Sequence, residues 1–184
     1  MGKKALINID YTNDFVADHG ALTCGKPGQE IEDALVSITK EFIRQGDYTV
    51  FAIDLHEKGD GYHPEADLFP PHNIRGTIGR DLYGKLKDEY EINKNLINVH
   101  YMDKTRYSAF AGTDLHIKLR ERDISDVYLV GVCSDICILH TAMDAYNLGY
   151  NIFIYENAIA SFNQTGHDWA LTHFEGVLGA TIIK

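Results

Sequence analysis

The sequence has few cysteines, no cluster of basic residues and no long hydrophobic run. Lysine and arginine number 17 against 27 aspartate and glutamate residues, which gives a net charge of −10. Proteins that bind nucleic acids need a basic surface to release counterions from the phosphates, so a nucleic-acid partner is excluded. No apolar stretch approaches the roughly 18 residues of a membrane-spanning helix, so we expect no membrane partner either.

The start of the chain and its cysteines predict a cytoplasmic protein. After a basic start, only a few apolar residues precede Asp10, which is too short for the hydrophobic region of a signal peptide. Cys24, Cys133 and Cys137 are odd in number and too few for a disulfide framework. This cysteine content fits a reducing compartment.

The composition is that of one ordinary globular domain. Hydrophobic residues make up 45% and charged residues 24% of the 184 residues, which excludes a disordered or fibrous chain. No internal repeat or linker is visible. We therefore expect residues 1–184 to form a single domain with a sizeable core.

Apolar runs alternate with segments of helical periodicity along the whole chain. The expected strands are 4–9, 48–53, 96–102, 127–132, 151–155 and 180–183, and the expected helices are 31–45, 114–122, 139–148 and 169–178. Continuous apolar strands between helices predict an α/β fold. We expect a three-layer, doubly wound, mostly parallel six-stranded sheet with helices on both faces. Residues 57–77 have no such pattern and are expected to form a functional loop.

Reactive side chains recur where the predicted strands end. Asp10 ends the first strand, Asp54 and His56 end the second, Lys104 follows the third, and Cys137 follows the fourth. Ligands bind at the carboxyl ends of the strands in open α/β sheets. This recurrence predicts an enzyme with its active site at that edge.

Cys137 is a candidate nucleophile in the first turn of a helix that Ser134 or Asp135 would cap. The helix dipole would lower the pKa of the thiol and favour the thiolate. Asp10 could take the thiol proton, and Lys104 would keep that carboxylate ionised. The alternative is that Cys137 is a small buried hydrophobic residue.

A candidate metal site comprises Asp54, His56, His72 and Glu65. Asp54 and His56 project to the same side of a strand, and His72 and Glu65 lie in the long loop. Two histidines with carboxylates suit Zn²⁺, Mn²⁺ or Fe²⁺. His63 is a competing ligand from the same loop.

Five motifs follow one another between residues 10 and 138. They are DYTNDF at 10–15, DLH at 54–56, FPPHNIRGTIG at 69–79, KTRYSAF at 104–110 and GVCSDICI at 131–138. Together they resemble the motifs of the nicotinamidase/pyrazinamidase branch of the isochorismatase-like cysteine hydrolases. The sequence departs from the family pattern at Thr12, Phe69 and Asn73, where Gln, Trp and Cys are usual. The motifs follow the family order, and the strand–helix pattern continues to the end of the chain.

The resemblance implies hydrolysis of nicotinamide to nicotinate and ammonia through a thioester, in NAD salvage, with pyrazinamide as an analogous substrate. It implies Cys137 as the nucleophile, Asp10 as general base and acid, and Lys104 as the third catalytic residue. The Val132–Cys133 peptide bond would be cis, and the N–H groups of Cys133 and Cys137 would form the oxyanion hole. One divalent ion, zinc before manganese or iron, would be bound by Asp54, His56, His72 and Glu65, and the ring pocket would be lined by Phe15, Phe69 and Tyr107.

Several alternatives remain open from the sequence. The chain could cleave another small amide, or isochorismate, within the same superfamily. It could be a metallo-amidase in which Cys137 is only structural, or a binding module without catalysis. Cys133 is either a core residue or a resolving thiol for oxidised Cys137. The resemblance also makes a homo-oligomer the expected assembly.

Overall fold

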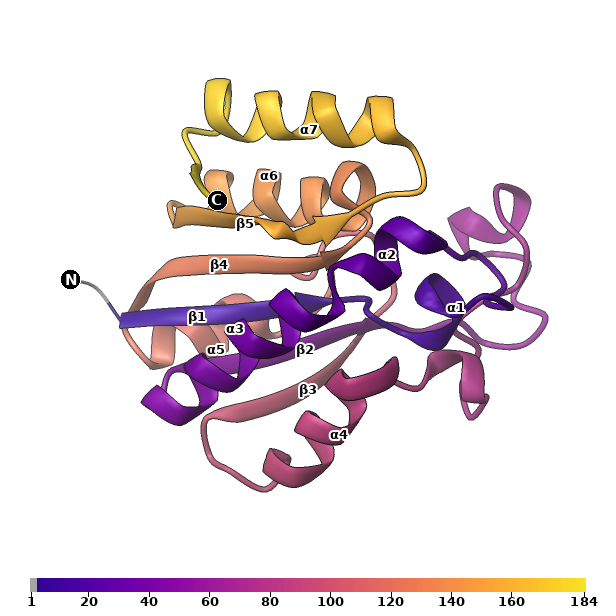
Figure 1. Cartoon of the computed structure of the whole chain (residues 1–184), viewed down its shortest axis with the longest axis horizontal. Coiled ribbons are helices and arrows are strands. Elements are labelled where there is room, and N and C mark those ends of the chain that lie inside the picture. Colours follow the sequence, from indigo (N-terminus) through magenta and orange to yellow (C-terminus); the bar gives the residue numbers. More distant parts are fainter. Residues whose placement is uncertain (1–2) are drawn as a thin grey trace.

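The computed structural model describes residues 3–184 and consists of a six-stranded sheet between two layers of helices (Figure 1). The strands are β1 (Lys3–Ile9), β2 (Tyr48–Asp54), β3 (Val99–Lys104), β4 (Ile124–Val132), β5 (Asn151–Ala160) and β6 (Thr181–Ile183). They pair in the order β3-β2-β1-β4-β5-β6, and every pair is parallel. The predicted α/β fold is confirmed. Met1 and Gly2 are outside the described residues, whereas the basic residues of the start, Lys3 and Lys4, belong to β1.

Helices cover both faces of the sheet. One face carries α3 (Glu32–Gln45) and α4 (Gly84–Asn93), with the short helices α1 (Asn13–Val16) and α2 (Lys26–Glu30) near its carboxyl edge; the other carries α5 (Leu115–Glu121), α6 (Leu139–Asn147) and α7 (Gln164–Gly176). Short turns η1 (Pro64–Asp67), η2 (Ile78–Arg80) and η3 (Ser134–Ile138) complete the described structure. None of the helices within residues 3–184 is both long and apolar enough to cross a lipid bilayer.

The alternation of side chains along β1 builds two cores. Ala5, Ile7 and Ile9 pack in the core under α5 and α6, whereas Leu6 packs in the core under α3. All four are fully buried because both faces of the strand are covered. A central strand without an exposed face explains why the sequence reads as a continuous apolar run.

Several elements differ from the sequence prediction. β3 begins at Val99 rather than 96, because Ile97 is 95% exposed and lies in the turn before the strand. The helix α4 was not predicted, because only Leu86 and Glu89 of its residues are buried and its apolar periodicity is weak. β5 continues to Ala160, and α7 begins at Gln164, five residues earlier than predicted.

The sheet order reverses between β1 and β4, and this switch point positions the site. Gly131 has φ +119°, and a Cβ atom there would overlap the carbonyl oxygen of Ile9. Glycine therefore lets the end of β4 lie directly against the end of β1. Asp10 directly follows β1 and Cys133 directly follows β4, so the two residues leave the sheet from neighbouring strands.

Candidate active site

Three buried side chains from three strand ends meet at the carboxyl edge of the sheet. Asp10 follows β1, Lys104 is the last residue of β3, and Cys137 lies in η3 after β4. Lys104 Nζ is 2.7 Å from Asp10 Oδ2 and 3.7 Å from Cys137 Sγ. The structure thus brings together the three residues that the sequence identified as catalytic candidates.

Burial and neighbouring charges set the protonation of this group. Burial raises the pKa of Asp10 to about 6, although the Lys104 ammonium opposes the shift. Burial alone would lower the pKa of Lys104, but the negative charges of Asp10 and Asp54 outweigh this and hold that pKa well above its usual range. Near neutral pH the group therefore contains an ammonium beside a carboxylate.

The surroundings of Cys137 oppose the expected lowering of its pKa. Burial raises the pKa of Cys137 well above its usual range, and the Lys104 ammonium offsets this only in part. Desolvation of a buried anion outweighs the partial charge at the start of one short turn. The Lys104 ammonium contacts both the Asp10 carboxylate and the Cys137 sulfur, which brings the candidate base close to the thiol.

The turn that carries Cys137 is tied to α7 rather than capped by its own side chains. Ser134 Oγ is 2.9 Å from His167 Nδ1, and Ser161 Oγ donates to Asp135 Oδ1 at 2.6 Å. The residue before the turn is Cys133, so the expected cap by Ser134 or Asp135 is wrong. The Val132–Cys133 peptide bond is cis, as the resemblance implies.

A second buried group contains two histidines and two carboxylates. One ligand atom each from Asp54, His56, Glu65 and His72 lies within 4.8 Å of the others. His56 Nε2 is 2.7 Å from Asp54 Oδ2, and His72 Nε2 is 3.5 Å from both Asp54 Oδ2 and Glu65 Oε2. Ligand atoms of a tetrahedral ion with bonds of about 2.1 Å are roughly 3.4 Å apart. The separations suit one small divalent cation.

The charges of this group also attract a cation. Burial would lower the pKa of His72, but the carboxylates of Asp54 and Glu65 outweigh it and raise that pKa to about 10. His72 Nε2 is buried and has no hydrogen-bond partner among residues 3–184. This buried ring nitrogen faces two carboxylate oxygens at 3.5 Å, which is the arrangement needed for one cation bound by the nitrogen and both oxygens. The four residues fit a divalent metal ion.

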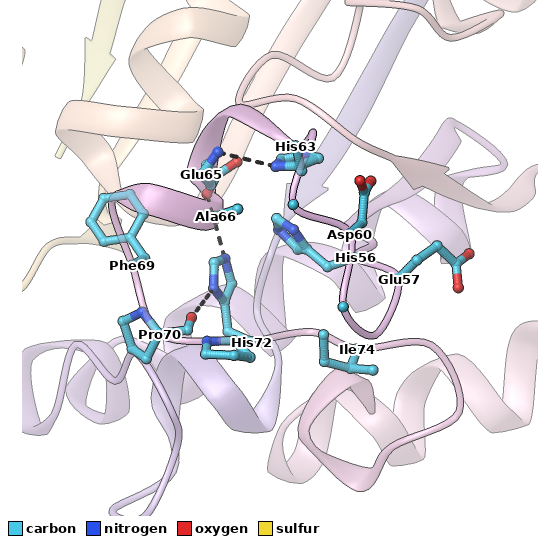
Figure 2. A pocket seen from close by; sticks show the side chains of 13 residues that line it. His56, Glu57, Asp60, His63, Glu65, Ala66, Phe69, Pro70, His72 and Ile74 are labelled. Carbon is cyan, nitrogen blue, oxygen red and sulfur yellow. Dashed lines mark hydrogen bonds and ion pairs between the residues drawn. The ribbon is translucent and has the colours of Figure 1, made fainter.

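The loop 57–77 closes this group, as Figure 2 shows. His72 Nδ1 is 2.8 Å from the carbonyl oxygen of Pro70, which leaves Nε2 facing the carboxylates. The backbone N–H of Glu65 donates to His63 Nδ1 at 3.2 Å, and His63 Nε2 is 2.8 Å from Thr105 O. Both nitrogens of His63 are therefore engaged, and Glu65 is the better candidate for the fourth ligand.

A cavity of about 250 Å³ opens beside the ligand group and is lined by His56, Glu65, Phe69 and His72 among others (Figure 2). Its size suits a small molecule. The rings of Phe15 and Phe69 lie 5.3 Å and 6.2 Å from the ring of His72. Tyr107 is partly buried against the core that contains Cys137, and its ring lies 5.1 Å from the ring of His140.

Comparison with known proteins identifies the family. The model of the isochorismatase domain matches residues 4–184. PncA of Bacillus subtilis strain 168, described as an uncharacterized isochorismatase family protein, is 63% identical over 182 residues. The match covers 99% of this chain and 100% of that protein. The chain belongs to the isochorismatase family.

Solved structures of isochorismatase-family proteins share the whole fold. The crystal structure of nicotinamidase/pyrazinamidase PncA from Bacillus subtilis matches with a TM-score of 0.98 and 61% identity, over 99% of this chain and 100% of that one. Pyrazinamidase of Pyrococcus horikoshii, solved in complex with zinc, matches with a TM-score of 0.86 and 25% identity, over 99% of both chains. Each is a protein to which this chain is similar over nearly its full length.

Asn73 connects the segment of Thr12 and Asp14 to the ligand group, and the sequence did not mark it as a site residue. Its N–H donates to Asp14 Oδ2 at 2.7 Å, and its side-chain oxygen accepts from Thr12 Oγ1 at 2.9 Å. Its carbonyl oxygen accepts from the His56 N–H at 3.1 Å, and it directly follows His72. Thr12 and Asn73 are thus in contact. Both depart from the family motifs, and this double departure was the signal that the sequence offered.

Arg80 was also missed. It donates to the carbonyl oxygens of Ile53 and Asp54 at 3.1 Å and 2.8 Å, and to Asp103 Oδ1 at 2.6 Å. These bonds satisfy the end of β2, from which two of the metal-ligand candidates project. No motif of the sequence marked this arginine.

Proposed function

We propose that the protein is a nicotinamidase, an amidohydrolase that converts nicotinamide to nicotinate and ammonia in NAD salvage, and pyrazinamide to pyrazinoate. The observation that carries the proposal is a buried Asp–Lys–Cys group beside a buried Asp–His–Glu–His group at one edge of the sheet. The names of the structural relatives from Bacillus subtilis and Pyrococcus horikoshii support it. Residues 1–184 act as one hydrolase domain.

The catalytic residues are Cys137, Asp10 and Lys104. Asp10 takes the proton of the Cys137 thiol, and the sulfur attacks the carboxamide carbon. The backbone N–H groups of Cys133 and Cys137 hold the oxyanion. Lys104 keeps Asp10 ionised at the start of the reaction and stabilises the thiolate that forms.

The second half of the reaction uses the same residues. Asp10 returns its proton to the nitrogen, the C–N bond breaks, and ammonia leaves a nicotinoyl thioester on Cys137. Asp10 then takes a proton from water, whose oxygen attacks the thioester carbon. Nicotinate leaves and the thiol of Cys137 is restored, so one water is consumed for each ammonia released.

Asp54, His56, Glu65 and His72 hold one divalent cation, for which zinc is the first candidate and manganese and iron are alternatives. Two imidazoles with two carboxylates suit all three ions. Bound there, the cation supplies a Lewis acid for the pyridine nitrogen of the substrate. Phe15, Phe69 and Tyr107 line the ring pocket. The substrate is a small molecule. We also infer a cytoplasmic location from the cysteine content, and a homo-oligomer from the resemblance to the family.

Ammonia release from nicotinamide, with and without prior treatment with iodoacetamide, tests this proposal. We expect release by the untreated enzyme and its loss after alkylation of Cys137. The variant Cys24→Ser, treated in parallel, controls for alkylation of that second thiol. Release that survives alkylation would identify a metallo-amidase, and a metal-loaded protein that releases no ammonia would exclude nicotinamide as the substrate.

A further inference from the structure

Two of the three cysteines form a thiol pair that the proposed reaction does not use. Cys24 Sγ lies 3.2 Å from Cys133 Sγ, although the two residues are 109 positions apart in the sequence. Their side chains are only 4% and 5% exposed. In hydrolysis Cys133 supplies its backbone N–H and Cys24 supplies nothing, so the contact between the two sulfur atoms has no part in the mechanism.

The backbone on both sides holds these sulfur atoms together. The N–H of Cys24 donates to the carbonyl oxygen of Phe15 at 2.8 Å, and a Cβ atom at Gly28 would come within 3.0 Å of Cys24 Cβ. The carbonyl oxygen of Cys133 accepts from the N–H groups of Ile136 and Ile138, both at 3.1 Å. The pair therefore connects the segment of Phe15 to the turn that carries Cys137.

We propose that Cys24 and Cys133 are an oxidation site, which closes to a disulfide under oxidising conditions and reversibly lowers turnover. The two thiols lose two protons and two electrons as the S–S bond forms. A diazene such as diamide accepts both hydrogens and becomes a hydrazine, and a peroxide accepts them and becomes water. A dithiol such as dithiothreitol reverses the step by exchange. The effect on turnover rests on the proposed function, whereas the linkage itself does not.

The partner of Cys133 is decided by packing. The sequence left open whether Cys133 is a core residue or a resolving thiol for Cys137, but the Cys137 sulfur contacts Lys104 Nζ. The Cys133 sulfur contacts Cys24 instead. The hydrogen bond with Cys24 and burial together raise the pKa of Cys133 well above its usual range, so its oxidation is slow and needs sustained exposure.

Closure of the pair moves part of the catalytic machinery. A disulfide bond is about 2.0 Å long, so the two sulfur atoms must approach by about 1.2 Å. Cys133 begins the turn that holds both proposed oxyanion donors and the nucleophile. Because a misplacement of about 1 Å in an active site can cost up to 100-fold in rate, we expect kcat to fall about ten- to 100-fold.

Peptide mapping under non-reducing conditions tests the linkage without any reference to activity. The variant Cys137→Ser is treated with diamide, digested and analysed by mass spectrometry. We expect a peptide pair joined through Cys24 and Cys133, which dithiothreitol separates. Full alkylation of both thiols after denaturation, with no joined pair, would overturn the proposal. The wild-type protein is mapped in the same way, and a Cys133–Cys137 linkage there would also overturn it.

Ammonia release by the wild type and by Cys24→Ser, before and after diamide, tests the effect on turnover. The reduced proteins are expected to be equally active, and their activity reports on the proposed function separately. After diamide, kcat of the wild type should fall and return with dithiothreitol, while Cys24→Ser keeps its kcat. Equal losses in both proteins, or a linked wild type with unchanged kcat, would overturn the regulatory effect.

Discussion

The two halves of the site differ in how the fold builds them. The reactive half consists of Asp10 directly after β1, Lys104 at the end of β3 and Cys137 in the turn η3 after β4. An ion pair of 2.7 Å joins Lys104 to Asp10. The ligand group takes Asp54 from the end of β2 but Glu65 and His72 from the long loop. There the closest approach of His72 to either carboxylate is 3.5 Å.

This difference shows that the two halves reach charge balance by different means. In the first half the Lys104 ammonium lies beside Asp10, and Asp54 is also within 3.5 Å of it. In the second half the buried carboxylates of Asp54 and Glu65 lie beside two imidazoles, and a divalent cation bound by all four residues would complete the charge balance. The reactive half is therefore pre-organised by the sheet, and the ligand half depends on its cation and its loop.

The largest expected effect comes from Cys137→Ala, which separates the two halves. Removal of the nucleophile should lower kcat by at least about 10⁴-fold. The metal content per chain should not change, because Cys137 is not among the ligand candidates. Ammonia release and elemental analysis of the same sample measure both. A loss of metal in this variant would show that the halves are not independent.

Lys104→Met breaks the charge balance of the reactive half. It leaves the buried Asp10 carboxylate without its ammonium, so we expect the free energy of unfolding to fall by about 3–5 kcal/mol and kcat to fall as well. Urea denaturation measures the first effect. The exposed Lys85 forms an ion pair with Asp33 at 2.6 Å, and Lys85→Met should cost at most about 1 kcal/mol. Similar losses in both variants would contradict the role given to Lys104.

His72→Ala tests the dependence of the ligand half on its cation. Without this ligand, metal affinity should fall by about 100-fold or more, and KM should rise more than kcat falls. Chelation should lower the melting temperature of the wild type, because an ion at 100 times its Kd stabilises the fold by about 2.7 kcal/mol. The variant should not respond to the chelator. A chelator-sensitive variant would place the cation elsewhere.

Thr12→Val sharpens the comparison by changing the ligand half at a distance. It removes the hydroxyl that donates to the buried Asn73 oxygen at 2.9 Å. Because Asn73 holds the His56 N–H and follows His72, metal affinity should fall about tenfold. Thr12→Ser keeps the hydroxyl and should retain the affinity. Titration of the metal-free protein with zinc measures both, and equal affinities would exclude this positioning role.

The pH dependence reports on the reactive half alone. Because the pKa of Asp10 is about 6, its carboxylate is protonated below that pH, and kcat/KM should fall about tenfold per unit. The pKa is raised above the usual value of 3.8, so this group favours the folded state more at low pH and loses that contribution as pH rises towards 6. Protonation of Asp10 at low pH therefore does not unfold the protein, and a loss of rate below pH 6 reports on the carboxylate itself. A rate that stays constant to pH 5 would contradict the shift.

The sequence predicted the reactive half better than the ligand half. Strand ends follow from local periodicity, so the apolar pattern alone places Asp10, Asp54 and Lys104 at one edge of the sheet. The choice between His63 and Glu65 could not be made, because it depends on contacts with Thr105 and within η1. The helix α4 and the residue Arg80 gave no periodic or motif signal strong enough to be recognised, and Asn73 was marked only as a departure from the family motif.

The sequence by itself determined the order of the six strands, the edge of the sheet that carries the reactive side chains, and the family motifs. Only the tertiary structure decided that Cys133 meets Cys24, that Asn73 meets Thr12, and that burial raises the pKa of Cys137. Periodicity is a local property, which neighbouring residues encode through propensity and burial. Contacts between distant residues and the desolvation of a buried charge arise only when the layers pack together.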